Sequence, residues 1–493
     1  MIDKSYQVNK LKRKLMKIGS DSLEKGNINT SLAALSFAAE TLYMYNQFYT
    51  DDGLEELTAQ VGDKVKAKYN FANYTNTQDA ILLYDGFGLD TRGVILMYLN
   101  ALGKNGYKVH YVTDFRVQNN IPTIKSMCAR YDIHISYINM ITYESGCVEL
   151  AKVFEDVKPR AAFFYTTPFD SSASAAFHMY EGLCKRYLID LTDHAYWLGK
   201  CANDYFLGSR EMSAYVQHYE RKIPKNKCIK LGVNLLMEEC NDHSGLPFDV
   251  EKYEYVFSGG ALYKTLGDLD NTYYKIVYHI LEKHEKIRFI YAGTGDDSEL
   301  KKIIAKFPDR AFHIDERKDF YYLIKNSVLY LNTYPMFGGM MMKYSALAHR
   351  LPITLKHGSD SDGLLLHQEE CQIEYNSYDD LIVDVDCLLE DEFYRQKREK
   401  LLDGSVITEQ RFINNVRDVI ENNKTDYSHD FLKLDTTEFR KEYYKRFNYR
   451  QNMLCIVNRR DMVLFWYFPD AFIIGILKKL LKKINNMIKK GSK

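Results

Sequence analysis

The chain has 493 residues, which exceeds the usual size of one domain and predicts two domains with separate cores. Its hydrophobic fraction of 46% and charged fraction of 27% are typical of a globular protein and exclude a disordered chain. Lysine plus arginine equals aspartate plus glutamate, at 66 each, so no excess of positive charge indicates a nucleic-acid partner.

The cysteine pattern and the lengths of the apolar segments indicate the cellular compartment in which the protein is expected. Nine cysteines occur without any C-x-x-C pair, which is typical of free thiols in a reducing compartment. The N-terminus lacks the apolar core of a signal peptide, and no stretch of about 18 uncharged apolar residues occurs that would span a membrane. We therefore expect a cytoplasmic protein.

Residues 1–75 form a segment that we predict to be helical. Residues 31–49, SLAALSFAAETLYMYNQFY, place apolar side chains near a helical period. Residues 51–65, DDGLEELTAQVGDKV, follow with acidic residues in the first turn, where the helix dipole favours them. The segment is interpreted as a helical hairpin, which could support a homo- or hetero-oligomer.

From residue 76 the pattern changes to an alternation of strands and helices. AILLYDGFG (80–88) is a short apolar run that ends in turn residues, VILMYLNALGKNG (94–106) is a helix with a glycine stop, and YKVHYVTDF (107–115) is another strand. Because the alternation continues, residues 76–237 are predicted to form one parallel-sheet α/β domain. After a polar stretch the same alternation returns over residues 253–421 and predicts a second such domain.

Ligands of parallel sheets bind beyond the carboxyl ends of the strands, and in a two-domain protein they bind between the domains. In the second domain the loops after the predicted strands contain small residues and cations. Glycines let backbone N–H groups approach an anion, and a lysine adds a full charge for a diphosphate. A single glycine pair could merely end a strand. Several such loops on one sheet edge favour a phosphate site, and they lie at residues 258–264, 293–296, 315–317 and 333–343.

The order of these motifs resembles the donor-binding half of GT-B glycosyltransferases of the bacterial surface-polysaccharide kind. The segments that carry the resemblance are FSGGALYKTLG (257–267), FIYAGTGDDSEL (289–300) and the run from HIDERKD to HRLPIT (313–354). In the first domain, residues 82–114 and 188–206 resemble the acceptor half. The resemblance covers about residues 80–420 and implies two Rossmann-like domains, with the N-terminal hairpin and a C-terminal amphipathic helix outside them.

The resemblance also implies a substrate and a set of donor-binding residues. The substrate would be a nucleotide diphosphate-sugar, and neither a cofactor nor a metal would be needed. The diphosphate would face Lys264 and the glycines after the first strand of the second domain, and the base would lie near Arg317. The glycine pair Gly338 and Gly339 would allow the backbone amides of the following helix to approach the phosphate. The full donor set is Gly259, Gly260, Lys264, Gly293, Gly295, Arg317, Tyr334, Gly338, Gly339, Met340 and Lys343.

One departure from the family concerns carboxylates on the donor side. Many retaining members have two glutamates eight positions apart across this loop, and Phe337 and Ser345 stand at the corresponding positions here. The sequence DSD at 360–362 formally fits an acidic metal motif. It follows a strand in the wrong position for the metal-dependent fold, and we expect no metal.

Candidates for chemistry on the acceptor side follow the strand YLIDLT. Asp193 and His194 could form a pair in which the carboxylate orients the histidine as general base, or the pair could only cap the next helix. Tyr196 and Trp197 offer aromatic faces on which a sugar could stack. The first loop adds Asp85, Gly86, Asp90 and Arg92, of which the arginine could hold an acceptor phosphate or form a local salt bridge.

Residues 422–493 are predicted as a helical, membrane-associating tail. After Asp470 the sequence contains no acidic residue and seven lysines. Within residues 462–490 a cluster of aromatic residues precedes a helix with apolar side chains on one face and lysines largely elsewhere, which is typical of a helix on an anionic membrane surface. The alternative is a helix that packs on its own protein with its lysines outward.

We therefore expect a glycosyltransferase that is peripheral on the inner face of the cell membrane. It would move a sugar from a nucleotide-sugar to a lipid-linked or surface glycan in polysaccharide biosynthesis of the cell envelope. Two alternatives are a polyol-phosphate transferase of the teichoic-acid polymerase kind and a catalytically degenerate GT-B subunit that serves as a scaffold.

Overall fold

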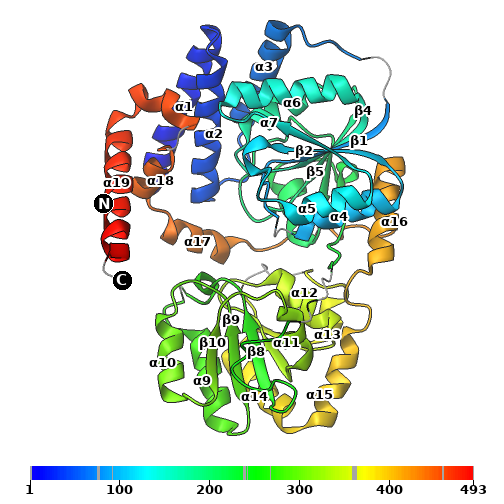
Figure 1. Ribbon diagram of the computed structural model, residues 1–493, viewed down its shortest axis with the longest axis vertical. Helices are drawn as coiled ribbons and strands as arrows, with labels where there is room; N and C mark the ends of the chain where they lie inside the picture. The colour runs from blue at the N-terminus through cyan, green and yellow to red at the C-terminus, as the bar shows by residue number, and fades with distance from the viewer. Residues whose placement is uncertain are drawn as a thin grey trace.

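The computed structural model describes residues 3–74, 78–90, 93–236, 240, 242–266, 268–357, 363–457 and 460–491. The described N-terminal segment contains three helices, α1 (Lys4–Glu24), α2 (Ile28–Tyr45) and α3 (Asp52–Tyr69). The Asp51 carboxylate accepts a hydrogen bond from the Leu54 N–H and caps α3. The helix α2 is buried along most of its length, between α1 and the first sheet domain (Figure 1).

The first domain is built on a sheet in which the described strands are all parallel, in the order β3-β2-β1-β4-β5-β6-β7. The strands are β1 (Gln78–Asp85), β2 (Lys108–Asp114), β3 (His134–Ile138), β4 (Pro159–Tyr165), β5 (Lys185–Ile189), β6 (Tyr205–Gly208) and β7 (Cys228–Lys230). The connecting helices are α4 (Gly93–Lys104), α5 (Pro122–Arg130), α6 (Tyr143–Val157), α7 (Ser171–His178) and α8 (Glu211–Tyr215).

Both faces of this sheet are buried, which explains why its strands are continuous apolar runs. Leu82 and Tyr84 of β1 face α2, α6 and α7 in one core. Ile81 and Leu83 alternate with them and face α4 in a second core.

The second domain has a parallel sheet with the described strand order β10-β9-β8-β11-β12-β13. Its strands are β8 (Tyr255–Gly259), β9 (Arg288–Ala292), β10 (Ala311–Ile314), β11 (Leu329–Leu331), β12 (Pro352–Leu355) and β13 (Glu374–Tyr375). Its helices are α9 (Thr272–Lys283), α10 (Ser298–Lys306), α11 (Phe320–Asn326), α12 (Gly339–Leu347), α13 (Gln368–Cys371), α14 (Tyr378–Glu390) and α15 (Glu392–Glu399). The predicted fold class, two Rossmann-like parallel-sheet domains with additional helices at both ends of the chain, is confirmed.

The helix α16 (Glu409–Asn422) returns to the first domain, although its sequence lies in the segment predicted as the second domain. Phe412, Val416 and Val419 are buried in the core that covers the α4 face of the first sheet. The Tyr187 hydroxyl donates to the Val419 carbonyl at 3.0 Å. The chain therefore crosses between the two domains twice, and α16 fastens the second crossing.

The C-terminal segment packs along the N-terminal helices on the left of Figure 1. It consists of α17 (Thr437–Arg446), α18 (Tyr449–Cys455), a 3-10 segment (Arg460–Tyr467) and α19 (Pro469–Gly491). The rings of Tyr45 on α2 and Phe447 after α17 lie 5.1 Å apart, and the Asn452 side-chain amide on α18 donates to Thr41 at 3.1 Å. Among the described helices, none combines the length and the apolar character needed to cross a bilayer.

Candidate functional site

A cavity of about 930 Å³ lies between the two sheet domains. The first domain contributes the residues that follow β5 and β6. The second domain contributes the segment around Lys264 and the residues from Met336 to Lys343. A third wall comes from the end of α2 and from α17 and α18. The cavity has the size typical of a small-molecule site.

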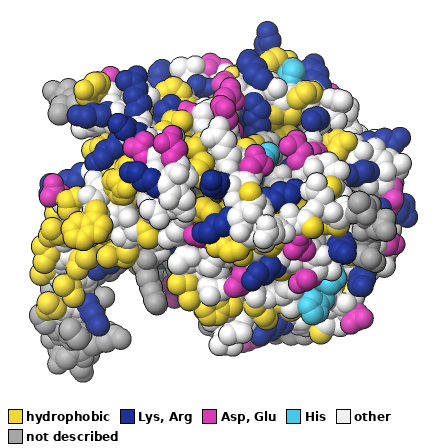
Figure 2. Space-filling model, turned by 90° about the horizontal axis from the view of Figure 1, so that it is seen from above, with side chains coloured by type: hydrophobic (Ala, Val, Ile, Leu, Met, Phe, Trp, Pro, Cys, Tyr) yellow, Lys and Arg dark blue, Asp and Glu magenta, His cyan; other side chains and the backbone are white. Residues whose placement is uncertain are grey.

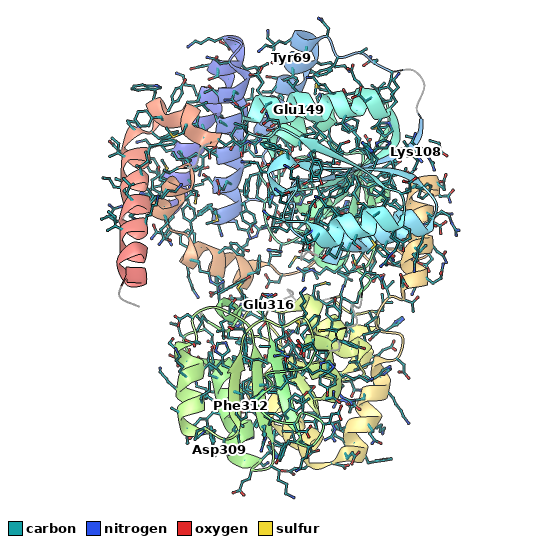
Figure 3. The ribbon with its side chains drawn as sticks, in the orientation of Figure 1. Tyr69, Lys108, Glu149, Asp309, Phe312 and Glu316 are labelled. Atoms are coloured by element: carbon teal, nitrogen blue, oxygen red, sulfur yellow. The ribbon has the colours of Figure 1, made fainter. Side chains whose placement is uncertain are left out.

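The carboxyl ends of the second sheet point toward this cavity. Figure 3 shows the direction on β10: Asp309, before the strand, lies at the far end of the domain, Phe312 lies midway, and Glu316, after the strand, lies at the end that faces the first domain. In parallel α/β sheets this edge is where ligands bind, so the cavity occupies the expected place.

Lys264 and the start of α12 form the second-domain wall of the cavity. Lys264 lies on a 3-10 turn after β8, and its Nζ donates to the Phe337 carbonyl at 3.1 Å, which ties the turn to the loop before α12. Gly338 is the N-cap of α12, and its N–H donates to the Asn332 side chain at 3.1 Å. The amides of the first helical turn, from Gly339 onward, have no intrahelical acceptors and carry the positive end of the helix dipole. A lysine and a helix N-terminus on one wall are suited to a phosphate.

Lys343 lies one turn further along α12 and is buried, with 6% of its surface exposed. Burial first, and then the Arg210 charge, lower the pKa of Lys343 to about 8, although the Asp193 charge acts to raise it. A buried ammonium is costly in free energy unless an anion faces it. An anionic ligand in the cavity would therefore be stabilised by Lys343 and would restore its full charge.

The other predicted donor residues lie behind this wall. A Cβ on Gly293 would be 1.9 Å from the Gly260 carbonyl oxygen, and a Cβ on Gly295 would be 3.0 Å from the Leu262 Cβ. Gly260 itself has a φ of 128°. These glycines allow the loops after β8 and β9 to pack against each other, which is a structural reason for their presence. Gly259 packs in the same way, because its Cβ would lie 3.3 Å from the Met341 Cε.

Arg317 and Tyr334 also lie outside the cavity lining. The Arg317 Nε donates to Asp319 at 2.7 Å, and its Nη2 donates to the Ser244 carbonyl at 3.0 Å, so the guanidinium fastens the interdomain linker to the second domain. The Tyr334 ring packs edge-on against His357 at 5.6 Å. Of the predicted donor residues, the structure brings together at the cavity Lys264, Gly338, Gly339, Met340 and Lys343.

Asp193 and His194 face this wall from the first domain, and both line the cavity. The Arg210 guanidinium binds the Asp193 carboxylate with two hydrogen bonds, of 2.5 and 2.8 Å, and the Ser213 hydroxyl donates to it at 3.1 Å. Burial acts to raise the pKa of Asp193, but Arg210 outweighs it and holds the pKa well below its usual range. Asp193 is therefore a fixed anion rather than a proton acceptor.

The predicted contact between Asp193 and His194 is present but long. The His194 Nδ1 lies 3.3 Å from Asp193 Oδ1, and the imidazole packs edge-on against Phe439 of α17 at 5.6 Å. The alternative in which the pair caps a helix is wrong, because α8 begins only after Arg210 and the Asp193 carboxylate accepts no backbone N–H of α8 in the described contacts.

Asp190 is a cavity residue that the sequence reasoning missed. It follows β5 directly, and its Oδ2 accepts a hydrogen bond of 2.8 Å from the Gln217 side chain. Its Oδ1 is buried without a hydrogen-bond partner among the described residues. Burial, reinforced by the charge of Asp193, raises the pKa of Asp190 to about 7. Its position at the end of the strand YLID could have identified it as a site residue, but the prediction chose Asp193 and His194, which follow three and four residues later.

The prediction that Trp197 and Tyr196 form a sugar platform is wrong. Trp197 is 3% exposed and Tyr196 is fully buried. The guanidinium carbon of Arg221 lies 3.3 Å from the centroid of the indole ring, so a buried cation occupies its face. Phe439 and Tyr443 of α17 line the cavity instead.

Among the predicted residues of the first loop, the described ones, Asp85, Gly86 and Asp90, have structural roles and do not line the cavity. Asp85 accepts hydrogen bonds from the backbone of its own loop at 2.9 and 3.0 Å and from the Tyr111 hydroxyl at 2.7 Å. Asp90 accepts two backbone N–H groups at the start of α5, at 3.0 and 2.9 Å. A Cβ on Gly86 would collide with Thr166 at 1.9 Å. Arg92 lies outside the described residues.

Across the part of the chain that the structure describes, no three His, Cys, Asp or Glu side chains cluster in a way that would hold a metal ion. The DSD sequence at 360–362 lies outside that part.

Comparison with known proteins identifies the fold. No protein-family model and no curated protein sequence matches the chain. Among solved structures, a variant of the O-GlcNAc transferase of Thermobaculum terrenum has a TM-score of 0.51 at 14% identity, over 87% of this chain and 84% of its own. A candidate UDP-N-acetylglucosamine 2-epimerase from Listeria monocytogenes has a TM-score of 0.52 at 11% identity, over 72% of this chain and 100% of its own.

A third similar structure is the HepE protein of Anabaena in complex with UDP and glucose. It has a TM-score of 0.50 at 10% identity, over 70% of this chain and 99% of its own. The two parallel-sheet domains and these similarities define a GT-B fold.

Proposed function

We propose that this protein is a glycosyltransferase that uses a nucleotide diphosphate-sugar as donor and a lipid-linked or surface glycan as acceptor. The observation that carries the proposal is the pairing across one cavity: Lys264, Lys343 and the α12 N-terminus on one wall, and the carboxyl groups of Asp190 and Asp193 on the other. Cations on one wall would stabilise the negative charge of a leaving diphosphate. A carboxyl group with a pKa close to 7 on the other wall could accept a proton.

The donor diphosphate would lie against the second-domain wall. Lys264 and the first-turn amides of α12 would bind its oxygens, and Lys343 would gain the anion that its buried ammonium needs. These groups would stabilise the charge that develops on the diphosphate as the sugar–phosphate bond breaks, without a metal or a separate cofactor. The Anabaena HepE structure, of similar fold, contains UDP and glucose, which supports a nucleoside diphosphate as a ligand of this fold.

The acceptor hydroxyl would approach from the first-domain wall. As its oxygen bonds to the sugar, its proton would pass to Asp190, whose pKa is raised to about 7 by burial. Asp193, held by Arg210, would stay charged and keep the wall in place. His194 is the second candidate for the proton acceptor, as the sequence predicts, and replacing each residue in turn would separate the two.

The acceptor would be anchored in the membrane, where the C-terminal helix would hold the enzyme. Leu477, Leu480 and Leu481 of α19 are exposed, which favours the interfacial helix over one that packs on its own protein. We infer from this a location on the inner face of the cell membrane and a role in cell-envelope polysaccharide biosynthesis.

A donor screen tests the proposal. Purified full-length protein is incubated with UDP-, GDP- and dTDP-sugars and with CDP-glycerol, and release of the nucleotide product is measured with and without a membrane lipid extract as acceptor. We expect release of a nucleoside diphosphate from one sugar donor that depends on the extract and falls at least about 10-fold in Lys264→Met. The control, Lys325→Met, replaces an exposed lysine of the same domain outside the cavity.

Three results would contradict the proposal. Release of CMP from CDP-glycerol would identify a polyol-phosphate transferase. Isomerisation of the sugar without any acceptor would identify an epimerase. The absence of both binding and turnover with every nucleotide would favour a scaffold subunit.

A further inference from the structure

The exposed side of α1 carries a stripe of positive charge. Lys10, Arg13, Lys14 and Lys17 are exposed, and Arg13 and Lys14 each lie three or four positions from Lys10 and Lys17, so all four lie on one face of the helix. The opposite face packs into the core of the N-terminal helices. From residue 4 to residue 20 the sequence contains no acidic residue, and the carboxylates of α1, Asp21 and Glu24, lie beyond this stripe in the last turns of the helix.

The helix α19 is attached to the protein through its first half, as far as its side chains are described: its first two turns pack closely, and the Lys479 Nζ donates to the Val457 carbonyl. Phe472 is fully buried, and a Cβ on Gly475 would lie 2.4 Å from Val457, so the first two turns press closely on the residues after α18. Beyond them the apolar side chains face outward, with exposed fractions of 54% for Leu477 and 58% for Leu481. Trp466, just before α19, is 85% exposed.

These two features adjoin each other. The Lys14 Nζ of α1 donates to the Tyr467 carbonyl at 2.7 Å and lies 4.2 Å from the centroid of the Phe468 ring, immediately before α19. The Phe468 ring in turn packs edge-on against Phe37 of α2 at 6.1 Å. Figure 2 shows hydrophobic side chains gathered along the left edge of the molecule, with lysine and arginine side chains beside them.

We propose that α1 and α19 together form one docking surface for an anionic lipid bilayer. The apolar side of α19 and Trp466 enter the interfacial layer, and the stripe of α1 binds the anionic headgroups beside it. This inference rests on the proposed membrane-peripheral function and assigns to α1 a role that the sequence reasoning gave to the C-terminal helix alone. The N-terminal hairpin thus contributes to a membrane contact instead of the predicted oligomer contact.

The chemistry of the surface favours a bilayer over other acidic partners. A nucleic acid would bind the cations but would leave the exposed leucines and tryptophan in water. A second copy of the chain would present the same positive charge, so the two copies would repel each other. An anionic bilayer matches both components, because it offers an apolar layer beneath a negatively charged one.

The surface is also connected to the cavity. The Lys4 Nζ of α1 donates to the Tyr444 carbonyl of α17 at 2.6 Å. The helix α17 lines the cavity through Phe439, Tyr443 and Arg446. The helix α18, which contacts both α1 and α19, lines the cavity through Gln451 and Asn452. A bilayer bound at α1 and α19 would therefore hold a membrane-anchored acceptor beside the wall of the cavity that α17 and α18 form.

Flotation with lipid vesicles tests the inference. The full-length protein is mixed with phosphatidylcholine vesicles that contain about 30% phosphatidylglycerol, or none, at about 0.15 M salt. The wild type is expected to float with the anionic vesicles only. Because each cation near an anionic surface contributes about 5-fold, the variant Lys10→Gln/Arg13→Gln/Lys17→Gln is expected to partition about 100-fold more weakly.

Two further variants separate the components. Leu477→Gln/Leu480→Gln/Leu481→Gln removes apolar contact from α19 and is expected to reduce flotation to the level of neutral vesicles. The matched control, Lys301→Gln/Lys302→Gln/Lys306→Gln, removes the same amount of charge from α10 in the second domain and is expected to bind like the wild type. All substituted side chains are exposed, and unchanged circular dichroism establishes that each variant is folded.

The outcomes distinguish this inference from the proposed function. If the wild type ignores anionic vesicles, both the inference and the membrane location fail. If the α1 variant floats like the wild type while the α19 variant does not, the inference fails and the membrane location stands. Binding to anionic vesicles that depends on α1 but not on the leucines would show that α19 does not enter the bilayer and would overturn the inference. So would a dimer that the α19 variant converts to a monomer in sedimentation velocity.

Discussion

Replacing Asp190 by asparagine should stabilise the protein at alkaline pH while removing its activity. The carboxyl group is buried beside Asp193, and its pKa is raised from 3.8 to about 7, first by burial and then by the neighbouring charge. Below about pH 4 the carboxyl group is largely protonated in both the folded and the unfolded protein, so it has little effect on the free energy of unfolding. As pH rises toward 7 the unfolded chain releases its proton first, and the free energy of unfolding falls.

Above pH 7 the buried charge of Asp190 lowers the free energy of unfolding by its full amount. The difference between the two pKa values limits this amount to about 4 kcal/mol. Asparagine has the shape of the protonated carboxyl group, keeps a partner for Gln217 at 2.8 Å and carries no charge to bury. We therefore expect Asp190→Asn to raise the free energy of unfolding at pH 8 by up to about 4 kcal/mol and to change it little at pH 4. Sugar transfer should fall about 100-fold or more, because no proton acceptor remains.

The assay is urea unfolding of both proteins at pH 4, 6 and 8, followed by tryptophan fluorescence, together with donor turnover at pH 8. The exposed Asp156→Asn on α6 serves as the matched control and should change neither quantity. Equal stability of Asp190→Asn and the wild type at pH 8 would refute the raised pKa. Full turnover in a stabilised Asp190→Asn would refute only its role as proton acceptor, and loss of turnover in His194→Ala would then identify the histidine.

Two further predictions concern the neighbouring charges. Asp193→Asn should destabilise the protein by about 3 kcal/mol near neutral pH, because Arg210 loses a buried carboxylate that binds it with two hydrogen bonds. Since the pKa of Asp193 is held below its usual range, this difference should shrink as pH falls below about 4, and an unchanged unfolding midpoint at pH 7 would contradict it. Lys343, whose pKa burial lowers to about 8, should make nucleotide affinity fall about 10-fold between pH 7 and 9 in calorimetry, because its deprotonated form attracts no phosphate. Lys343→Arg should abolish this fall, and a fall that persists in it would exclude Lys343 as the titrating group.

The sequence was sufficient to predict the two sheets and part of the second-domain wall of the cavity, for a physical reason. A parallel sheet displays the residues that follow its strands along one edge, so Lys264 and the glycines before α12 could be placed from strand order alone. Lys343 followed from helical spacing after Gly339.

The first-domain wall was predicted less completely: Asp193 and His194 line the cavity as expected, but Asp190 was missed and Trp197 is buried. A polar residue after a strand can face a cavity, as Asp190 does, or cap a neighbouring helix, as Asp90 does at α5. Only the packing of distant segments decides between them. Trp197 was expected at the surface, but Arg221, more than twenty residues later, covers its ring. For the same reason residues 409–421 were assigned to the second domain, although α16 packs on the first domain.

The central claim, a nucleoside diphosphate site at Lys264 and the α12 N-terminus, is tested most directly by calorimetric titration of the full-length protein with UDP, GDP and dTDP, the nucleotides of the sugar donors in the screen. We predict that one of these nucleotides binds with a stoichiometry of about one and that Lys264→Met weakens it by about 10-fold or more, whereas the exposed Lys325→Met leaves it unchanged. Failure of all three to bind, or equal affinity in the wild type and Lys264→Met, would contradict the account.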